Sequence, residues 1–184
     1  IAFIGAGRVF KHYLFILDKI NKDEYEIVAI CEKNKSLINY YRKKIDTNFF
    51  LSKESLIKSQ IKPDVIFILT PSGLHYEHSI YFLKNNINVI TEKPITLKIE
   101  QAKKLISFAK RKKLMFGAVF QNRFNLPVMF VKKIIQQNKL GKISGFSVSL
   151  IWCRTQNYYS DEWHGTWKMD GGVTSQQAIH HLDA

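Results

Sequence analysis

A strand that ends in an acid, a base and a proline is the strongest chemical signal in this sequence. The apolar run Ile87–Ile90 leads into the tripeptide Glu92-Lys93-Pro94. In open α/β sheets, ligands bind at the carboxyl ends of the strands, so Lys93 would place an ammonium group at that edge. Proline fixes its own φ and tolerates a cis bond, so Pro94 can set the direction of Lys93. Alone, the tripeptide also fits an ordinary strand-ending turn with solvated side chains.

The amino end holds a glycine-rich turn suited to a dinucleotide. After Ile1–Ile4 the sequence runs Gly5-Ala6-Gly7-Arg8-Val9-Phe10 and then takes a helical pattern. Gly5 permits a tight turn, and Gly7 lets the backbone approach a pyrophosphate at the amino end of a helix. Phe10 stands where such turns have a third small residue, so helix and strand must pack differently there. The turn alone also fits a strand-to-helix connection without a ligand.

An acid after the second apolar run fits ribose recognition. The run Glu26–Cys31 ends at Glu32, which lies 25 residues after Gly7; a ribose-binding acid is expected about 20 residues on. A carboxylate accepts hydrogen bonds from the ribose hydroxyls and repels a 2′-phosphate, so Glu32 predicts NAD. Lys33 follows directly and can weaken that preference, which leaves NADP open.

A second loop is expected at the same edge. Thr70-Pro71-Ser72-Gly73 follows the apolar run Val65–Leu69, so its hydroxyl and backbone groups are placed to contact a cofactor. His75 and His78 come next with helical spacing. No third ligand lies nearby in the sequence, so we predict no metal site.

Alternating apolar runs and helical patterns predict a doubly wound α/β fold with a parallel sheet. We expect strands at Ile1–Ile4, Glu26–Cys31, Asn48–Leu51, Val65–Leu69, Ile87–Ile90 and Leu114–Phe120. Helices are expected at Val9–Ile20, Ser36–Lys44, Lys53–Ser59, His75–Lys84, Ile99–Lys110 and Pro127–Gln137. The strands are apolar throughout, as in a sheet covered on both faces. The first domain is expected to span residues 1–121.

The pattern changes after Gly141. Residues 143–152 alternate apolar and polar, which predicts a half-exposed strand of an antiparallel or mixed sheet. After Gly171-Gly172 a helix is expected to run to the end of the chain. One strand and one helix cannot complete a sheet domain, and the chain begins inside a strand. We therefore expect residues 122–184 to be the first part of a truncated second domain.

Three polar residues of the last helix fall on one stripe. Gln176, His180 and Asp183 have the spacing i, i+4 and i+7. An imidazole titrates near neutrality and a polar neighbour can fix its tautomer, so His180 is a candidate general base. The same stripe also fits a solvated helix face. The residues on the other sides are expected to suit the core: Ala178, Ile179 and Leu182.

Positive charge dominates the middle of the chain. The net charge is +13, and no Asp or Glu occurs between Glu100 and Asp161. A one-signed field draws anionic ligands toward a cleft that it borders. Lysines at helix ends also fit a solvated basic face, whereas Arg123 and Arg154 stand among aromatic and polar residues. A nucleic-acid-binding module would explain the charge but not the ordered motifs.

The sequence indicates a protein of a reducing compartment, and we expect it in the cytoplasm. Cys31 and Cys153 are isolated thiols without metal-like spacing, as expected of packed small side chains. No apolar run approaches the ~20 residues of a membrane span, so no membrane partner is predicted.

The motifs, taken in order, resemble the Gfo/Idh/MocA family of sugar and polyol oxidoreductases. The resemblance rests on Gly5-x-Gly7, Thr70-Pro71-Ser72-Gly73-x-His75, Glu92-Lys93-Pro94, Gln121-Asn122-Arg123, and Gly171-Gly172 followed by His180-x-x-Asp183. It implies a Rossmann domain followed by an α/β domain whose open, mostly antiparallel sheet forms a homo-oligomer contact. It also implies that Lys93 contacts the nicotinamide ribose and the substrate hydroxyl, while His180 moves the proton. Inositol dehydrogenase-like members have Asp where Gln176 stands, which disfavours an inositol.

Motifs and resemblance together give two sets of site residues. The set expected to bind the cofactor is Gly5, Gly7, Arg8, Val9, Glu32, Thr70, Ser72, His75, Glu92, Lys93 and Gln121. The set expected to bind substrate is Lys93, Arg123, Arg154, Tyr158, Trp163, His164, Gln176 and His180.

The expected activity is NAD(P)-dependent interconversion of a secondary hydroxyl and a ketone. The resemblance implies a sugar, a sugar acid or a nucleotide-linked sugar as substrate, with Lys93 and His180 as catalytic residues. A catalytically silent NAD-binding regulator of the same fold is one alternative, and a basic nucleic-acid-binding module is another.

Overall fold

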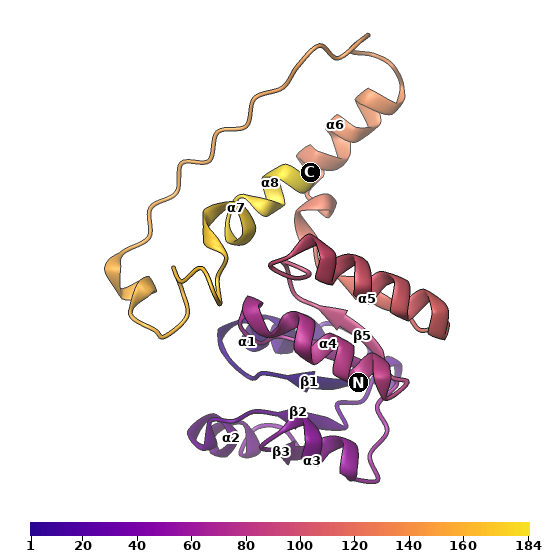
Figure 1. The fold of residues 1–184 in the computed structure, drawn as a ribbon, viewed down its shortest axis with the longest axis vertical. Helices are drawn as coiled ribbons and strands as arrows, with labels where there is room; N and C mark the ends of the chain where they lie inside the picture. The colour runs from indigo at the N-terminus through magenta and orange to yellow at the C-terminus, as the bar shows by residue number, and fades with distance from the viewer. The chain divides into compact units, whose positions relative to one another are not determined.

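Short runs of Ala, Val, Ile and Phe pair side by side into one parallel sheet in the computed structural model, which describes residues 1–184 (Figure 1). The strands are β1 (Ala2–Ile4), β2 (Ala29–Cys31), β3 (Asn48–Phe50), β4 (Val65–Ile68), β5 (Asn88–Thr91) and β6 (Phe116–Ala118). Their order is β3-β2-β1-β4-β5-β6, and every neighbouring pair is parallel. This order reverses between β1 and β4, as in dinucleotide-binding sheets. The predicted doubly wound sheet is confirmed.

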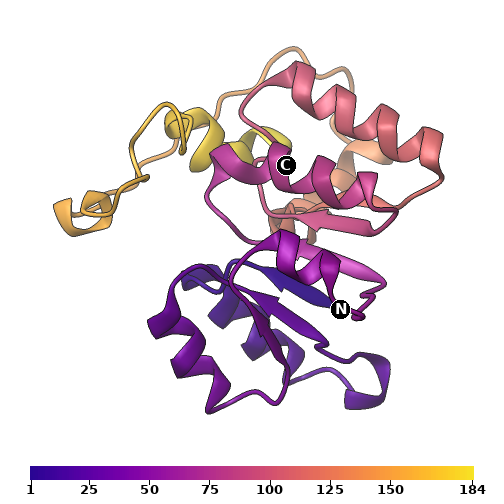
Figure 2. The same cartoon turned by 60° about the horizontal axis from the view of Figure 1, so that its bottom comes forward.

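Helices connect successive strands on both sides of this sheet, as Figure 2 shows. They are α1 (Arg8–Leu17), α2 (Lys35–Arg42), α3 (Lys53–Lys58), α4 (His75–Lys84) and α5 (Ile99–Lys112), with the short turns η1 (Lys22–Glu24) and η2 (Ser72–Leu74). The helices α1 to α5 lie where the sequence predicted helices, and side chains cap the amino ends of α2 and α3. At α2, for example, the Asn34 side chain accepts from the N–H groups of Ser36 and Leu37. Strands and helices up to Ala118 form one compact unit, and residues from Val119 form a second.

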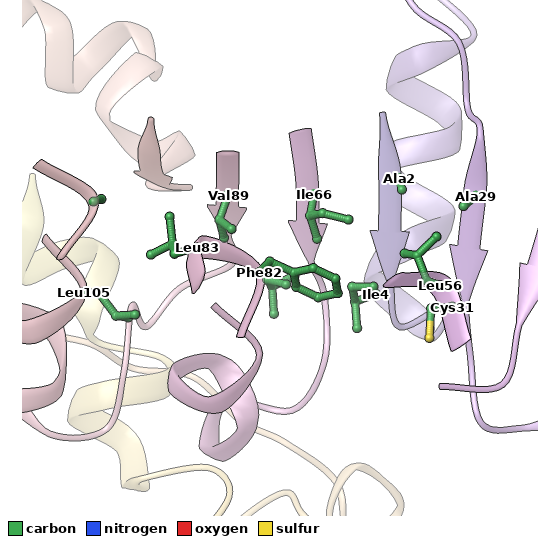
Figure 3. Packing of buried hydrophobic residues seen from close by; sticks show 12 residues of the cluster. Ala2, Ile4, Ala29, Cys31, Leu56, Ile66, Phe82, Leu83, Val89 and Leu105 are labelled. Atoms are coloured by element: carbon green, nitrogen blue, oxygen red, sulfur yellow. The ribbon is translucent and has the colours of Figure 1, made fainter. Parts of the chain in front are cut away.

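Alternate strand residues face two separate apolar layers of the first unit. On one face, Ile4 and Ile66 pack with Phe82 of α4, as seen from close by in Figure 3. On the other face, Phe3 and Ile30 pack against α1 and α2. Burial on both faces is why the strands read as unbroken apolar runs rather than as alternating ones.

Phe10 takes the place of the small third residue of the glycine-rich turn. It is fully buried, and its ring meets those of Phe3 and Tyr41 edge-on, with centroids 5.0 Å apart in each case. These aromatic contacts fill the space between α1, β1 and α2 that a small residue would close by direct approach.

The second unit contains helices but no strand. Its elements are η3 (Gln121–Phe124), α6 (Leu126–Gln136), η4 (Gln156–Tyr159), α7 (Gly172–Gln176) and α8 (Ile179–Asp183). The strand predicted at residues 143–152 was wrong for this structure, because no segment pairs with those residues. Phe146 and Ile151 are 88% and 91% exposed there. A strand exists only as part of a hydrogen-bonded ladder, so the alternating pattern alone does not form one.

The single helix predicted at the end of the chain was also wrong. It is interrupted at Gln177 and Ala178, between α7 and α8. Gln176 and His180 are both buried, while Leu182 is 60% exposed. The two polar residues therefore share one face, as their spacing predicts, but this face is the buried one, and the expectation that Leu182 suits the core was wrong.

The remaining expectations of the sequence concern cysteines and membrane spans. Both cysteines are free thiols; Cys31 is buried as expected, whereas Cys153 is exposed. No helix combines the length and the apolar character needed to cross a membrane.

Candidate active site

The turn after β1 brings glycine backbone against the end of β4. Gly5 has a φ of +94°, and a side chain there would lie 3.0 Å from the Leu69 carbonyl oxygen. The Gly5 N–H donates to the Cys31 carbonyl oxygen at 2.8 Å, which joins the turn to β2. Glycine alone combines this left-handed backbone with such a close approach. The tight turn expected at Gly5 is therefore present.

Gly7 leaves open space at the amino end of α1. No atom lies within 4 Å of the point where a side chain would begin. Gly7 is the N-cap residue, no side chain caps the helix, and its first turn contains no acid. The amino-terminal N–H groups and the helix dipole favour an anion at such a place. Arg8 and Val9 are exposed in this first turn.

Two backbone N–H groups orient the Glu32 carboxylate. Oε2 accepts from the Ala6 N–H at 2.7 Å, and Oε1 accepts from the Asn34 N–H at 2.8 Å. Each carboxylate oxygen has a further lone pair with which to accept from a ribose hydroxyl. The glycine-rich turn thus holds the candidate ribose acid in a defined position.

Tyr13 links α1 to Glu92, a contact that the sequence analysis missed. The Tyr13 hydroxyl donates to Glu92 Oε1 at 2.8 Å, and the Lys93 N–H donates to Oε2 at 3.2 Å. Burial, reinforced by the Glu92 charge, raises the pKa of Tyr13 far above its usual value, so the phenol stays a donor. The helical spacing could have indicated that Tyr13 faces the sheet, because it follows the buried Phe10 by three residues and so lies on the same side of α1.

Lys93 stands at the carboxyl edge of the sheet, beside the end of β4. It follows Thr91 and Glu92 at the end of β5 and is half-buried. The Glu92 N–H donates to the Ile68 carbonyl oxygen at 3.0 Å, which holds the tripeptide against β4. The Lys93–Pro94 peptide bond is cis. An ammonium group is therefore present at the edge that also carries the glycine-rich turn.

His75 lies inside this edge rather than on its surface. It is only 1% exposed, with Nδ1 at 2.6 Å from the Pro94 carbonyl oxygen and Nε2 at 2.8 Å from that of Thr70. Burial lowers its pKa. The ring joins two loops of the edge, which indicates a positioning role, while the direct cofactor contact suggested by the sequence stays a prediction.

The loop after β4 offers one accessible hydroxyl. Thr70 is half-buried, and its Oγ1 lies 3.1 Å from His78 Nδ1. Burial, followed by the charge of Lys53, lowers the pKa of His78 to about 4, so this ring is neutral at pH 7. Ser72 is 3% exposed. Thr70 is therefore the better placed of the two predicted hydroxyls.

In the second unit, His180 is a buried side chain of α8. Its ring lies edge-on to that of Phe120, with centroids 6.3 Å apart. Gln176 is buried as well, whereas Gln121, at the start of η3, is exposed.

Arg123 forms a two-point ion pair with Asp183, within the same unit. Its Nε and Nη2 donate to Oδ2 and Oδ1 of Asp183, each at 2.6 Å. Hydrogen bonding to Arg123 lowers the pKa of Asp183. The guanidinium predicted to bind substrate thus contacts a carboxylate of the His180 helix.

The other predicted substrate residues gather in an aromatic group. The Arg154 guanidinium lies 4.8 Å from the ring centroid of Trp152 and 5.4 Å from that of Tyr158. The His164 ring lies 4.3 Å from that of Tyr158 and 3.6 Å from that of Trp163, centroid to centroid. Arg154 is exposed. A guanidinium stacked on rings keeps its edge available for an anion.

Two family models match consecutive parts of this chain. One is described as the NAD-binding Rossmann fold of an oxidoreductase family and matches residues 1–120. The other is the C-terminal alpha/beta domain of an oxidoreductase family and matches residues 132–184. The open position at Gly7 and the oriented Glu32 carboxylate fit NAD in the first unit.

Individual relatives are dehydrogenases. D-glucoside 3-dehydrogenase of Escherichia coli is 27% identical over 149 residues, which cover 78% of this chain and 40% of that protein. The WlbA dehydrogenase of Chromobacterium violaceum, solved with NADH and UDP-GlcNAcA, is 30% identical with a TM-score of 0.94, over 99% of this chain and 52% of that one. The Bordetella pertussis WlbA dehydrogenase, solved with the same ligands, is 30% identical with a TM-score of 0.93, over 99% and 54%. The chain spans about half the length of these relatives.

Proposed function

Because the chain belongs to the Gfo/Idh/MocA family of oxidoreductases, we propose that the protein interconverts a secondary hydroxyl and a ketone on an anionic sugar, with NAD as cofactor. The observation that carries the proposal is the carboxyl edge of the first unit. There the open Gly7, the oriented Glu32 and the ammonium of Lys93 follow β1, β2 and β5. Bound NAD supplies the hydride acceptor.

Lys93 and His180 have different roles at the substrate hydroxyl: His180 accepts the proton, and Lys93 stabilises the oxygen. In the oxidation, the hydroxyl proton passes to a neutral ring nitrogen of His180, and the hydride leaves the same carbon as the C=O bond forms. The Lys93 ammonium donates a hydrogen bond to the oxygen while negative charge develops on it. In the reduction, His180 returns the proton. A silent regulator needs neither residue.

We propose an anionic substrate, a sugar acid or a nucleotide-linked sugar. Arg154, stacked on Trp152 and Tyr158, supports this choice because its exposed guanidinium suits a carboxylate or a phosphate. The absence of acids between Glu100 and Asp161 adds a field of the matching sign. The WlbA relative binds UDP-GlcNAcA, which is the same kind of ligand.

We also propose that the protein forms a homo-oligomer through a sheet of its C-terminal domain, in a reducing compartment such as the cytoplasm. The resemblance suggests the assembly. Exposed apolar side chains in the second unit, among them Phe130, Phe146 and Ile151, support a surface that is covered when the protein is assembled.

A substrate panel tests the proposed activity. The full-length protein is mixed with NAD or NADP and with neutral, carboxylated, phosphorylated and nucleotide-linked sugars, while the absorbance of reduced cofactor is recorded. We expect turnover with NAD and an anionic sugar, and loss of turnover in Lys93→Ala. Equal turnover of neutral and anionic sugars would remove the substrate class. Saturable NADH binding without any turnover would favour the silent regulator, and strongly salt-dependent nucleic-acid binding without NADH binding would favour the basic module.

A further inference from the structure

An ion pair lies beside the candidate proton-transfer histidine. Asp183 follows His180 by three residues on α8. The pKa of Asp183 is lowered first by its hydrogen bonds to Arg123, and the charge of His180 adds to the effect. Residues three apart on a helix are neighbours, so the charge of the Asp183 carboxylate acts on the proton affinity of the imidazole.

Arg123 engages both oxygens of that carboxylate. The two hydrogen bonds have equal length, 2.6 Å, and the Asp183 side chain is only 16% exposed. The Phe120 ring lies beside both Arg123 and His180. The Arg123 guanidinium lies 5.4 Å from its centroid, and the His180 ring meets it edge-on. Nε and Nη2 of Arg123 thus bond to Asp183, while the Arg123 side chain itself is 60% exposed.

We propose that Arg123 is a positioning residue that sets the proton affinity of His180 by neutralising Asp183. An uncompensated carboxylate at this distance along the helix would stabilise the imidazolium, and His180 would then be a poorer base near pH 7. In this proposal Arg123 acts on His180 through Asp183, whereas the sequence suggested a direct contact with the substrate. The proposal rests on the proposed role of His180 as proton acceptor.

Besides Asp183, other charged groups can act on His180; by the proposed mechanism the Lys93 ammonium is one of them, and Arg123→Gln and Asp183→Asn both retain it. Of the elements packed against α8, η3 contributes only Arg123, and α7 contributes no charged residue. On α8 itself the other titratable group besides Asp183 is His181. Trp152 packs on His181 and brings Arg154 into the surroundings.

The pH dependence of kcat/KM for sugar oxidation tests the proposal. Arg123→Gln should move the acidic limb to higher pH by roughly half a unit, because Asp183 keeps its charge. Asp183→Asn should move the limb to lower pH, because Arg123 then stands uncompensated. The double variant should return close to the wild-type profile. Lys132→Gln, which removes an exposed charge from α6, is the control and should leave the limb in place.

An NMR titration separates this proposal from the activity itself. The ring resonance of His180 is assigned with His180→Gln, and its titration midpoint is followed in the same variants of the full chain. Opposite shifts in the two single variants support the proposal even if no substrate is turned over. Midpoints that stay unchanged in both, or a raised KM in Arg123→Gln without movement of the acidic limb, would overturn it and make Arg123 a substrate ligand.

Discussion

At the scale of single residues, Glu32 combines negative charge with a fixed orientation. Glu32→Gln keeps an oxygen that can accept the Ala6 N–H but loses the charge that repels a 2′-phosphate. We expect the preference for NAD over NADP to fall by roughly ten- to a hundredfold, since a hydrogen bond to a charged group contributes about 1.5–3 kcal/mol. Fluorescence titration with NADH and NADPH measures both dissociation constants.

The matched control for this substitution is Glu24→Gln on η1, which removes an equal charge away from the carboxyl edge. It should leave the ratio of the two dissociation constants unchanged. The assignment of Glu32 to the ribose fails if the ratio is also unchanged in Glu32→Gln.

Tyr13 holds the carboxylate of Glu92 through one hydrogen bond. Tyr13→Phe leaves Glu92 partly buried without that donor, so we expect a stability loss of about 1 kcal/mol and several-fold weaker NADH binding. Tyr25→Phe is the control, because its hydroxyl donates to the Leu17 carbonyl oxygen, outside this edge. Comparable loss of NADH affinity in both variants would mean that Tyr13 acts on stability alone.

The residues that follow strand ends could be predicted from the sequence. Gly5 and Glu32 come directly after strands of the parallel sheet and Lys93 follows β5 by two residues, so all three could be placed at its carboxyl edge. The partners of Glu92 and the burial of His75 could not, because both depend on contacts between elements far apart in the chain. Local pattern carries no information on such contacts.

At the scale of elements, the Phe10 ring fills the space between α1 and β1, where a small residue would let helix and strand touch directly. The ring is fully buried against Phe3 and Tyr41, so Phe10→Ala should destabilise the first unit by about 3–5 kcal/mol. Phe15→Ala on the same helix is the control, because Phe15 is 63% exposed. Urea unfolding measures both. A loss below about 1 kcal/mol in Phe10→Ala would show that the helix closes on the strand without the ring.

Buried histidines make the first unit sensitive to acid. The pKa of His78 is lowered to about 4 in the fold, and that of His75 is lowered too, mainly by burial. The unfolded chain therefore takes up protons below about pH 6.5 while the folded unit does not, so stability falls from pH 6.5 toward pH 4. For His78 alone the loss is at most about 3 kcal/mol.

Urea unfolding at pH 7 and pH 5 measures this loss. His78→Gln removes the titrating group, so its stability should fall less between the two pH values than that of the wild type. His12→Gln, on the exposed side of α1, should behave like the wild type. An equal fall in all three proteins would place the acid sensitivity elsewhere.

Elements were predictable where local pattern and final environment agree. The strands and helices up to Ala118 lie within a few residues of their predicted positions, since both faces of the sheet are covered within the same unit. Residues 143–152 carry a strand pattern without a pairing partner in the structure. The break at Gln177, between α7 and α8, is not visible in the periodicity of the sequence.

At the scale of the whole molecule, the proposed chemistry draws on both units. The first provides the dinucleotide edge with Lys93, and the second provides His180 with Arg123 and Asp183. The chain spans about half the length of its dehydrogenase relatives, and the activity is proposed for the whole protein. Lys93 and His180 are proposed to act on one substrate oxygen, opposite a nicotinamide ring.

The most direct measurement is a crystal structure of the full chain with NADH and a nucleotide-linked sugar acid. We predict that the Lys93 ammonium nitrogen and one ring nitrogen of His180 both lie about 3 Å from the same sugar oxygen, whose carbon faces the nicotinamide. Lys93 and His180 on separate surfaces, with the sugar touching only one of them or neither, would contradict the proposed mechanism.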